Sequence, residues 1–527
     1  MPESETMNAP LPETSSPPTV PALLAYAVER FGDDDFLVMP GHRISFREAD
    51  SASRLLAKRL VAAGLGKGAR IGLLIPSGVS FATAWFAAAR IGAIPMHFST
   101  TYRAGELRDV LRLGDVQLLI TVNDLVGRHT ATLIETALPG IEQQSSGQLL
   151  LPGAPYLRSV WFMDFCDRGW ASSAVDVFEE RVAGIDDRMM AEIESEVSPS
   201  DVLAVIFTSG SAAQPKAVVH SQGNGIRKTG PGVKLWPEIA APRRYFCGMP
   251  FFWIGGTQML LSALHHGGTI VCQERFDAAE AAQLIRREHC SGMSGWLVDQ
   301  IPGAAEIENV NFSLARDIKH VSSKGDPRNL GMTETFGPHR DPAFFEYRVL
   351  DPATGEALPD GTEGEFCVRG PGMMLEMYKM ERHEVFDFAG FHHTGDRGYV
   401  EDGTIFFTGR YSEMIKSAGA NVAPQEVERA LMSLADVASA VVFGIPDERR
   451  GELIVALVVP SATAPDVDAE AVKAQLRDVI SPYKIPQLIH FVEETDIPRL
   501  MSGKADKISI RSAFVARSTT QTKSEAT

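Results

Sequence analysis

Alternating helical and strand-like segments between Val20 and about Thr121 constrain the fold of this chain most strongly. Ser45 and Glu48 have the spacing of a capping box, which predicts a helix that begins there and runs to about residue 61. The short apolar run at 71–75 and the alanine-rich segment at 81–91 then predict a strand followed by a helix. Because strands that alternate with helices form βαβ units, we expect an α/β domain built on a mainly parallel sheet.

The pattern changes in the last third of the chain. Asp-Pro, Thr-Gly and Asp-Gly turn signals between short apolar runs predict hairpins over 349–368, and a further strand is predicted at 404–408. After Gly409, helices at 427–434 and 469–480 alternate with β-rich runs, which indicates a small separate α/β domain. The predicted boundaries are a disordered tail at 1–18, an N-terminal domain with a β-rich part at 19–409, a C-terminal domain at 410–516 and a second disordered tail at 517–527.

Composition narrows the class of protein further. A chain of 527 residues exceeds what one hydrophobic core usually holds, so two or more domains are expected. The formal net charge of -17 disfavours sequence-independent binding to nucleic acid. The five cysteines are widely spaced and odd in number, which predicts reduced thiols rather than disulfides or a zinc site. Because the sequence has neither a signal-peptide pattern nor a long apolar run, we expect a cytoplasmic protein with no integral membrane segment.

A loop of small residues follows the strand predicted at 203–207. From Thr208 to Lys216 it reads Thr-Ser-Gly-Ser-Ala-Ala-Gln-Pro-Lys. Small side chains let backbone N–H groups approach phosphate oxygens, and Lys216 adds positive charge, so the loop suits a triphosphate. Pro215 and Ala217 stand where a P-loop requires Gly and Ser or Thr, which excludes a P-loop NTPase. A plain surface loop rich in Ser and Gly is the competing interpretation.

Four other short motifs carry polar groups suited to nucleotide chemistry, and each also has an ordinary structural explanation. Thr333 and Glu334 offer a hydroxyl and a hard oxygen ligand for Mg²⁺, or they simply start a helix. Asp396 lies in a predicted turn, where it can bind a ribose diol or close an Asx turn. Arg410 stands at a natural linker position, and Lys504 alone would be an ordinary exposed lysine.

The order of these motifs carries more information than any one of them. The chain resembles the adenylate-forming superfamily of acyl-CoA synthetases, luciferases and peptide-synthetase adenylation domains. The resemblance extends from about Val20 to Phe514, includes the region 70–95, and rests on the ordered segments Thr208–Lys216, Gly331–Glu334, Thr394–Asp396, Gly409–Arg410, Met414–Glu428 and Ser502–Lys504.

The resemblance implies an acid–CoA ligase that forms AMP and acts in fatty acid metabolism or a related pathway. It uses ATP, Mg²⁺ and CoA, and its substrate is a medium-chain fatty, aryl or alicyclic carboxylic acid. Lys504 is implied to bridge the acid and the α-phosphate, Thr333 to bind phosphate and Glu334 to hold Mg²⁺. The residues implied to bind the nucleotide are Thr208, Ser209, Gly210, Ser211, Lys216, Asp396 and Arg410.

The second half-reaction is implied to need rotation of the C-terminal domain about a hinge. Ser412 occupies the hinge position, where the family usually has Asp or Lys, and the loop with Lys416 and Gly419 is implied to serve thiol transfer. The predicted acid pocket contains aromatic residues and glycines, which shape an apolar slot. Its members are Trp253, Gly255, Gly256 and Trp296, with Phe251 and Phe252 as members or as plain core residues.

Three departures from the family pattern leave alternatives open. Ala212, Ala213 and Ala217 replace residues that are usually Thr or Gly, and the segments at 324–330 and 339–348 are shorter than in relatives. One alternative is a non-catalytic family member disabled by the short segments. Another is a ligase that loads a separate carrier protein instead of CoA. A homodimer is compatible with the resemblance, and the sequence names neither the acid nor the pathway.

Overall fold

The structure is a computed structural model in which two compact units form. The first unit holds the described residues up to Ile301 together with 344–346 and Arg369–Phe391, and the second holds Tyr347–Val368 and the described residues from His392 onward. The described residues are 17–208, 215–230, 244–294, 301, 344–352, 354–401, 404–410, 414–417, 420–447, 450–465, 467–480, 482–499, 505–507 and 509–515.

The largest sheet of the first unit has eight strands, and its central pairs are parallel. At one edge, β8 pairs with β9 and β9 with β15 in the antiparallel sense. The mainly parallel sheet predicted from the sequence is therefore confirmed. In sheet order the strands are β15 (Glu376–Met377), β9 (Lys216–Ser221), β8 (Val202–Thr208), β4 (Ile94–His97), β3 (Arg70–Leu74), β5 (Leu118–Thr121), β6 (Ser159–Phe162) and β7 (Ser172–Ser173).

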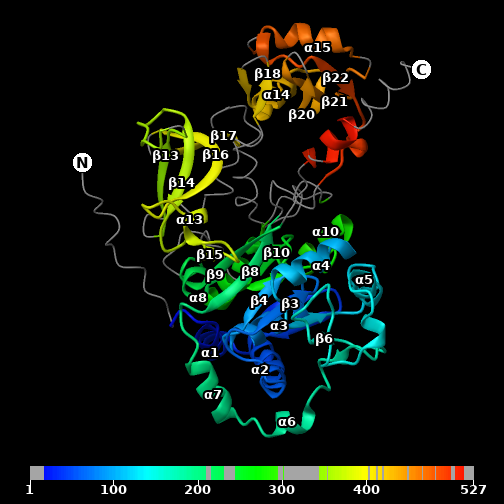
Figure 1. Ribbon diagram of the computed structural model, residues 1–527, viewed down its shortest axis with the longest axis vertical. Helices are drawn as coiled ribbons and strands as arrows, with labels where there is room; N and C mark the ends of the chain where they lie inside the picture. The colour runs from blue at the N-terminus through cyan, green and yellow to red at the C-terminus, as the bar shows by residue number, and fades with distance from the viewer. Residues whose placement is uncertain are drawn as a thin grey trace. The chain divides into compact units, whose positions relative to one another are not determined.

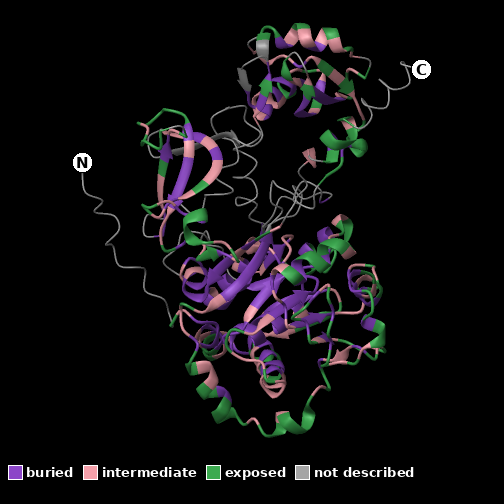
Figure 2. Ribbon diagram, viewed as in Figure 1, coloured by how far each residue is buried: buried purple, intermediate pink, exposed green. Residues whose placement is uncertain are grey.

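Helices pack on both faces of this sheet (Figure 1). Leu73 of β3 belongs to one buried cluster with α2 (Phe46–Ala62) and α3 (Val79–Ala89), whereas the next residue, Leu74, belongs to another with α4 (Ala104–Leu113) and α5 (Thr130–Ala137). Successive side chains of a strand point to opposite faces, so each strand is buried from both sides. Figure 2 shows the resulting burial of these strands.

Local sequence explains where the helices of this layer begin. The Ser45 hydroxyl accepts a hydrogen bond from the Glu48 N–H (3.2 Å), and the Glu48 carboxylate accepts one from the Ser45 N–H (2.7 Å). This reciprocal pair is the predicted capping box, and α2 starts at the next residue. In α3, every residue from Phe81 to Ala89 is buried, as expected for a helix that is apolar on all sides.

A second sheet of the first unit has five strands, with parallel pairs except between β1 and β2. Its strands, in order, are β12 (Gly292–Ser294), β10 (Arg244–Cys247), β11 (Thr269–Val271), β1 (Asp35–Met39) and β2 (His42–Ser45). The remaining α-helices of this unit are α1 (Val20–Phe31), α6 (Glu179–Ala183), α7 (Asp187–Ser195), α8 (Gln222–Arg227), α9 (Ile254–His266), α10 (Ala278–Arg287) and α13 (Arg382–Val385), counting described residues only.

The described part of the second unit forms two sheets. The predicted hairpin region forms a four-stranded sheet of β13 (Glu346–Leu350), β14 (Gly364–Arg369), β16 (His392–Glu401) and β17 (Thr404–Arg410). The C-terminal sheet contains β18 (Ile415–Ser417), β19 (Ala420–Val422), β20 (Val437–Asp447), β21 (Gly451–Pro460) and β22 (Leu488–Phe491), with helices α14 (Pro424–Met432) and α15 (Ala469–Leu476).

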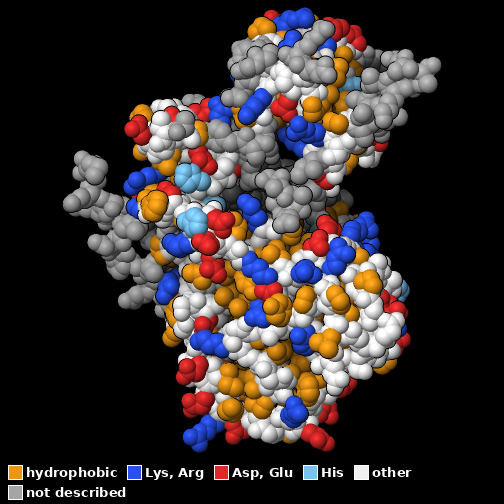
Figure 3. Space-filling view, in the orientation of Figure 1, with side chains coloured by type: hydrophobic (Ala, Val, Ile, Leu, Met, Phe, Trp, Pro, Cys, Tyr) orange, Lys and Arg blue, Asp and Glu red, His pale blue; other side chains and the backbone are white. Residues whose placement is uncertain are grey.

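Three further features concern the cysteines, the helices and the surface charge. The five cysteines all lie in the described part of the chain, and no two of them are joined by a disulfide. Within the described part of the chain, every helix is too short or too polar to span a lipid bilayer. On the face drawn in Figure 3, acidic and basic side chains are interspersed, and the coloured residues form no broad basic patch there.

Candidate functional site

The predicted phosphate loop is closed at its base by two paired strands. Thr208, the last residue of β8, lies directly opposite Lys216, the first residue of β9. β8 runs parallel to β4, so the loop leaves the sheet at the carboxyl end of a buried parallel strand, where open α/β sheets bind their ligands. The Lys216 side chain is exposed. Ser209, Gly210 and Ser211 lie outside the described residues.

Asp396 lies inside strand β16, so the prediction that it sits in a turn is wrong. An irregularity in the pairing of β14 with β16 explains the turn-like sequence: Cys367 pairs with His393 and Glu365 with Arg397, which leaves the three intervening residues of β16 as a bulge. Gly395 has φ +70° in this bulge, a left-handed conformation that suits glycine. The Thr-Gly-Asp sequence therefore forms a bulge within a strand here, and not a turn between strands.

Side chains hold this bulge in place. The Thr394 hydroxyl donates to the Phe366 carbonyl (2.8 Å) and accepts from the Asp396 N–H (3.0 Å). From the facing strand, the Glu365 carboxylate accepts from the Gly395 N–H (3.0 Å). Asp396 itself is 5% exposed, so these contacts fix a carboxylate that is almost fully buried.

Arg410 is the register partner of Asp396. The two residues face each other across β16 and β17, with Arg410 as the last residue of its strand. Sequence reasoning placed them in one nucleotide site although they are separated along the chain, and the pairing brings their backbones together. Their roles toward a ligand stay predictions.

The predicted acid-pocket residues surround the start of α9. Trp253 is the residue before the helix and is half-buried, and Gly255 and Gly256 lie in the first turn. Gly256 packs so tightly that an added Cβ would lie 2.3 Å from the Pro250 carbonyl oxygen. Trp296 lies outside the described residues.

The two phenylalanines before Trp253 belong to the hydrophobic core. Phe251 is fully buried, its ring centroid lies 6.0 Å from that of Phe81, and its N–H donates to the Ser77 hydroxyl (3.0 Å). Phe252 is 3% exposed and belongs to the same cluster. The core interpretation of these two residues therefore agrees with the structure.

The predicted thiol-transfer loop is the tip of a short hairpin. β18 and β19 pair antiparallel, with Lys416 opposite Asn421. The Lys416 side chain is exposed, and the backbone N–H of Lys416 donates to the Glu452 carboxylate (2.8 Å). Gly419 lies outside the described residues, as do Ser412, Thr333, Glu334 and Lys504.

Sequence reasoning missed Glu365 and His393, which lie at the bulge that contains Asp396. Their side chains contact each other, with 2.9 Å between the carboxylate Oε2 and the ring Nδ1. Nothing in the local pattern connects two residues 28 positions apart. A glutamate on a strand that faces a bulge would be recognised only after the register of β14 and β16 is known.

Comparison with known proteins gives consistent matches over the chain. The profile of the AMP-binding enzyme family matches residues 24–296, and that of the AMP-binding enzyme C-terminal domain matches residues 426–504. A sulfoacetate–CoA ligase of Cupriavidus necator is 26% identical, with 93% of this chain and 97% of the relative covered. A 3-[(3aS,4S,7aS)-7a-methyl-1,5-dioxo-octahydro-1H-inden-4-yl]propanoyl:CoA ligase of Mycobacterium tuberculosis is 27% identical, with 94% and 98% covered.

Solved structures share the fold. A fatty acyl CoA synthetase of Mycobacterium tuberculosis superposes with a TM-score of 0.65 at 22% identity, and 95% of this chain and 99% of the other are covered. An anthranilate CoA ligase, AuaEII, in complex with anthranoyl-AMP superposes with a TM-score of 0.73 at 18% identity, with 98% and 100% covered. The α/β fold with a large N-terminal and a smaller C-terminal domain is therefore shared with these enzymes.

Proposed function

Because the chain belongs to the AMP-binding enzyme family, we propose that it activates a carboxylic acid with ATP and transfers the acyl group to CoA. In the first half-reaction, a carboxylate oxygen of the acid bonds to the α-phosphorus of ATP and pyrophosphate leaves. In the second, the CoA sulfur bonds to the acyl carbon, AMP leaves, and the thiol proton goes to solvent. The relatives named above support a ligase of this type.

The observation that carries this proposal is the pairing of Thr208 with Lys216 at the carboxyl end of a buried parallel strand. A loop closed in this way can present N–H groups and one lysine to a triphosphate without disturbing the sheet. Thr208 and Lys216, at the two ends of the loop, are proposed to bind the phosphates, and Ser209, Gly210 and Ser211 are proposed to complete the site.

Asp396 is proposed to accept hydrogen bonds from the ribose hydroxyls, with Arg410 beside it. A carboxylate can accept a hydrogen bond from each of the two hydroxyls of a ribose diol. The bulge held by Thr394 and Glu365 supports this role, because a group that recognises a ligand works best when its supporting contacts are already in place.

Lys504, Thr333 and Glu334 keep the roles implied by the sequence. Lys504 would offset the negative charge that develops as the acid and the α-phosphate approach, and Thr333 would bind phosphate. Glu334 offers the carboxylate that Mg²⁺ prefers when it is shared with phosphates, and bound Mg²⁺ would screen phosphate charge. We further propose that Ser412 lies at the hinge and that the loop of Lys416 and Gly419 serves thiol transfer.

The acid is proposed to be apolar: aryl, alicyclic or medium-chain. Trp253 is half-buried at the start of α9, where it can contact an apolar group while its ring stays anchored on the core. The name of one relative, a ligase of a fused-ring propanoate, supports alicyclic acids as first compounds to test. Sulfoacetate, from the name of another relative, serves as the polar comparison.

An acid panel tests the proposed function directly. The protein is incubated with ATP, Mg²⁺, CoA and each acid, and pyrophosphate and CoA thioester are both measured. Formation of both products with at least one apolar acid is expected. Pyrophosphate without thioester would redirect the assignment to carrier-protein loading, and neither product would identify a non-catalytic family member.

Lys504→Ala separates the two half-reactions. We expect the variant to lose about 100- to 1,000-fold in the rate of pyrophosphate release, because one preorganised charge near the transition state is typically worth that much. Thioester formation from supplied acyl-AMP should stay close to wild type. Lys473→Ala, which removes a partly buried lysine paired with Glu470, is the matched control and should leave both rates unchanged. Equal loss in both half-reactions would contradict the role of Lys504.

A further inference from the structure

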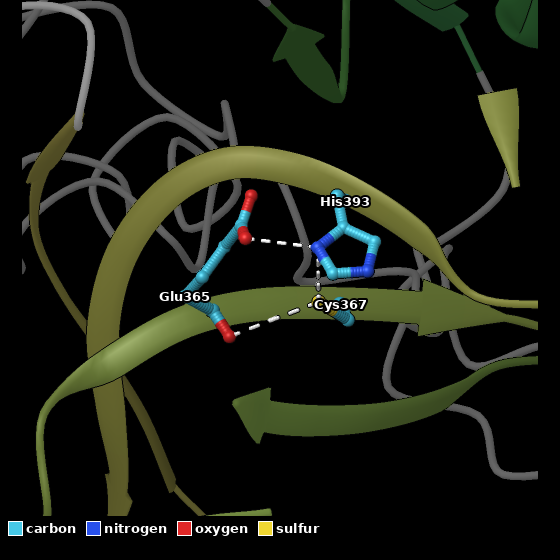
Figure 4. A group of neighbouring side chains, drawn as sticks. All are labelled: Glu365, Cys367 and His393. Atoms are coloured by element: carbon cyan, nitrogen blue, oxygen red, sulfur yellow. Dashed lines mark hydrogen bonds and ion pairs between the residues drawn. The ribbon is translucent and has the colours of Figure 1, made fainter. Parts of the chain in front are cut away.

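Three possible metal-binding side chains converge between strands β14 and β16. Glu365 and Cys367 are two residues apart on β14, so they project from the same face, and His393 is the register partner of Cys367 on β16. Figure 4 shows the three side chains turned toward one another. Their carboxylate, thiol and imidazole donor atoms all lie within 4.8 Å of one another.

The spacing of these atoms is close to that of a metal site. The His393 Nδ1 lies 2.9 Å from the Glu365 Oε2 and 3.4 Å from the Cys367 Sγ. Around a tetrahedral Zn²⁺, bond lengths of about 2.0–2.3 Å place nitrogen, oxygen and sulfur ligands roughly 3.3–3.7 Å apart. Small side-chain rotations would therefore open a central position that is equally near to all three donors.

The donor set selects the class of metal. A thiolate and an imidazole favour Zn²⁺ and similar transition metals, whereas Mg²⁺ prefers oxygen ligands throughout. Three protein ligands leave a fourth position for water, as in open zinc sites. We propose that Glu365, Cys367 and His393 bind a divalent transition metal such as Zn²⁺, at a site separate from the Mg²⁺ that the proposed reaction would use.

Access and protonation are compatible with such a site. The His393 side chain is 44% exposed and that of Glu365 is 14% exposed, so an ion can enter from the His393 side, whereas Cys367 is fully buried and forms the floor. On binding, the Cys367 sulfur exchanges its proton for the metal, the proton goes to solvent, and His393 binds through an unprotonated Nδ1.

Glu365 connects this site to the bulge that contains Asp396. Its Oε2 faces His393, whereas its Oε1 accepts from the Gly395 N–H. A metal on Oε2 leaves the second contact intact, so the ion and the bulge can share one carboxylate. The metal site does not depend on the proposed ligase activity, and its test has a readout of its own.

Metal titration of the untagged, reduced full-length protein tests the proposal. Co²⁺, added in the presence of excess Mg²⁺, is expected to produce a near-ultraviolet thiolate-to-cobalt charge-transfer band that saturates at one equivalent and is displaced by Zn²⁺. Because the band arises only from a sulfur-bound ion, its absence in the wild-type protein would overturn the proposal, whatever the behaviour of any variant.

Variants identify the ligands. Cys367→Ser should abolish the band, and His393→Ala or Glu365→Gln should weaken Zn²⁺ binding by about 100-fold or more, since loss of an outer-shell partner alone costs 10–100-fold. Cys166→Ser and His383→Ala are the matched controls: Cys166 is a partly exposed thiol, and His383 forms an exposed pair with Glu381 that lacks a thiol. Loss of the band in Cys166→Ser, or its persistence in Cys367→Ser, would place the metal elsewhere.

Discussion

His97 is a titratable ring enclosed by aromatic side chains. It ends β4, is 1% exposed, and its ring centroid lies 5.0 Å from that of Phe81 and 5.6 Å from that of Trp85. Burial disfavours the charged form and lowers the pKa of His97 to about 3. The folded protein therefore holds a neutral ring at pH values where the unfolded chain would take up a proton.

This difference predicts a pH dependence of stability. Between pH 6.5 and about 3, the unfolded state binds more protons at His97, so the free energy of unfolding falls as pH falls. Near pH 5 the loss is about 2 kcal/mol relative to pH 7. In His97→Phe, denaturant unfolding should show a shallower decline between pH 7 and 5.

The matched control for His97→Phe is His383→Phe, which replaces a ring that is 75% exposed and should leave the slope unchanged. The comparison uses the change with pH within each variant, so any packing cost of Phe at position 97 cancels. An unaltered slope in His97→Phe would mean that the unfolded and folded states titrate alike at this ring.

At the level of single residues, sequence reasoning was strongest where a side chain acts on its near neighbours. The capping of α2 by Ser45 and Glu48 could be predicted because both partners lie within four positions. The location of Asp396 in a strand could not, since the bulge depends on Glu365, about 30 residues away. The burial of His97 likewise depends on the packing of α3 against β4, which no local pattern specifies.

Among the elements, α9 shows how a glycine can be required for packing rather than for ligand contact. An added Cβ at Gly256 would meet backbone atoms, 2.3 Å from the Pro250 oxygen and 2.7 Å from the Phe251 Cα. At the adjacent Gly255, an added Cβ would meet the Sδ of Met249 at 2.7 Å, and that side chain can move. Two neighbouring glycines therefore differ sharply in what they tolerate.

Paired alanine substitutions test this difference. Gly256→Ala should lower the free energy of unfolding by about 1–3 kcal/mol, the usual range for overpacking, because the start of α9 must shift away from Pro250. Gly255→Ala should change stability by much less, since Met249 can rotate. Thermal and denaturant unfolding measure both effects. A Gly256→Ala variant as stable as wild type would show that the start of α9 can shift without a measurable cost in stability.

Element boundaries were predicted best where a single strong signal stands at the end. β21 (Gly451–Pro460) ends at the predicted proline, and α2 starts at its cap. The helix predicted at 469–480 ends instead at Leu476, and turn residues follow it. Apolar residues keep a helical spacing beyond Leu476, so the hydrophobic periodicity alone predicted a helix that is too long.

At the level of the whole molecule, the two units have separate hydrophobic cores. Leu73 is fully buried in a cluster with α2 and α3 in the first unit, and Leu476 is fully buried in a cluster with β20 and β21 in the second. Separate cores can unfold separately, so a two-state description is not expected to hold. The sequence could predict two or more domains from length alone, whereas the membership of the hairpin sheet requires the contacts themselves.

Leu73→Ala and Leu476→Ala form a matched pair of core variants. Each should cost about 2–5 kcal/mol in its own unit, because a buried Leu→Ala change removes packing and leaves a cavity. In differential scanning calorimetry we expect each variant to lower the temperature of a different transition. A single transition that both variants shift alike would show that the units unfold together.

The path of the chain has a consequence for recombination between relatives. Arg369–Phe391 belongs to the first unit, although the segments on either side of it, Tyr347–Val368 and the chain from His392, belong to the second. A recombination junction within Arg369–Phe391 would join β14 of one parent to β16 of another, although these two strands pair with each other. A breakpoint after Arg410, where β17 ends, keeps all four strands from one parent, so shuffled libraries should place their junction there.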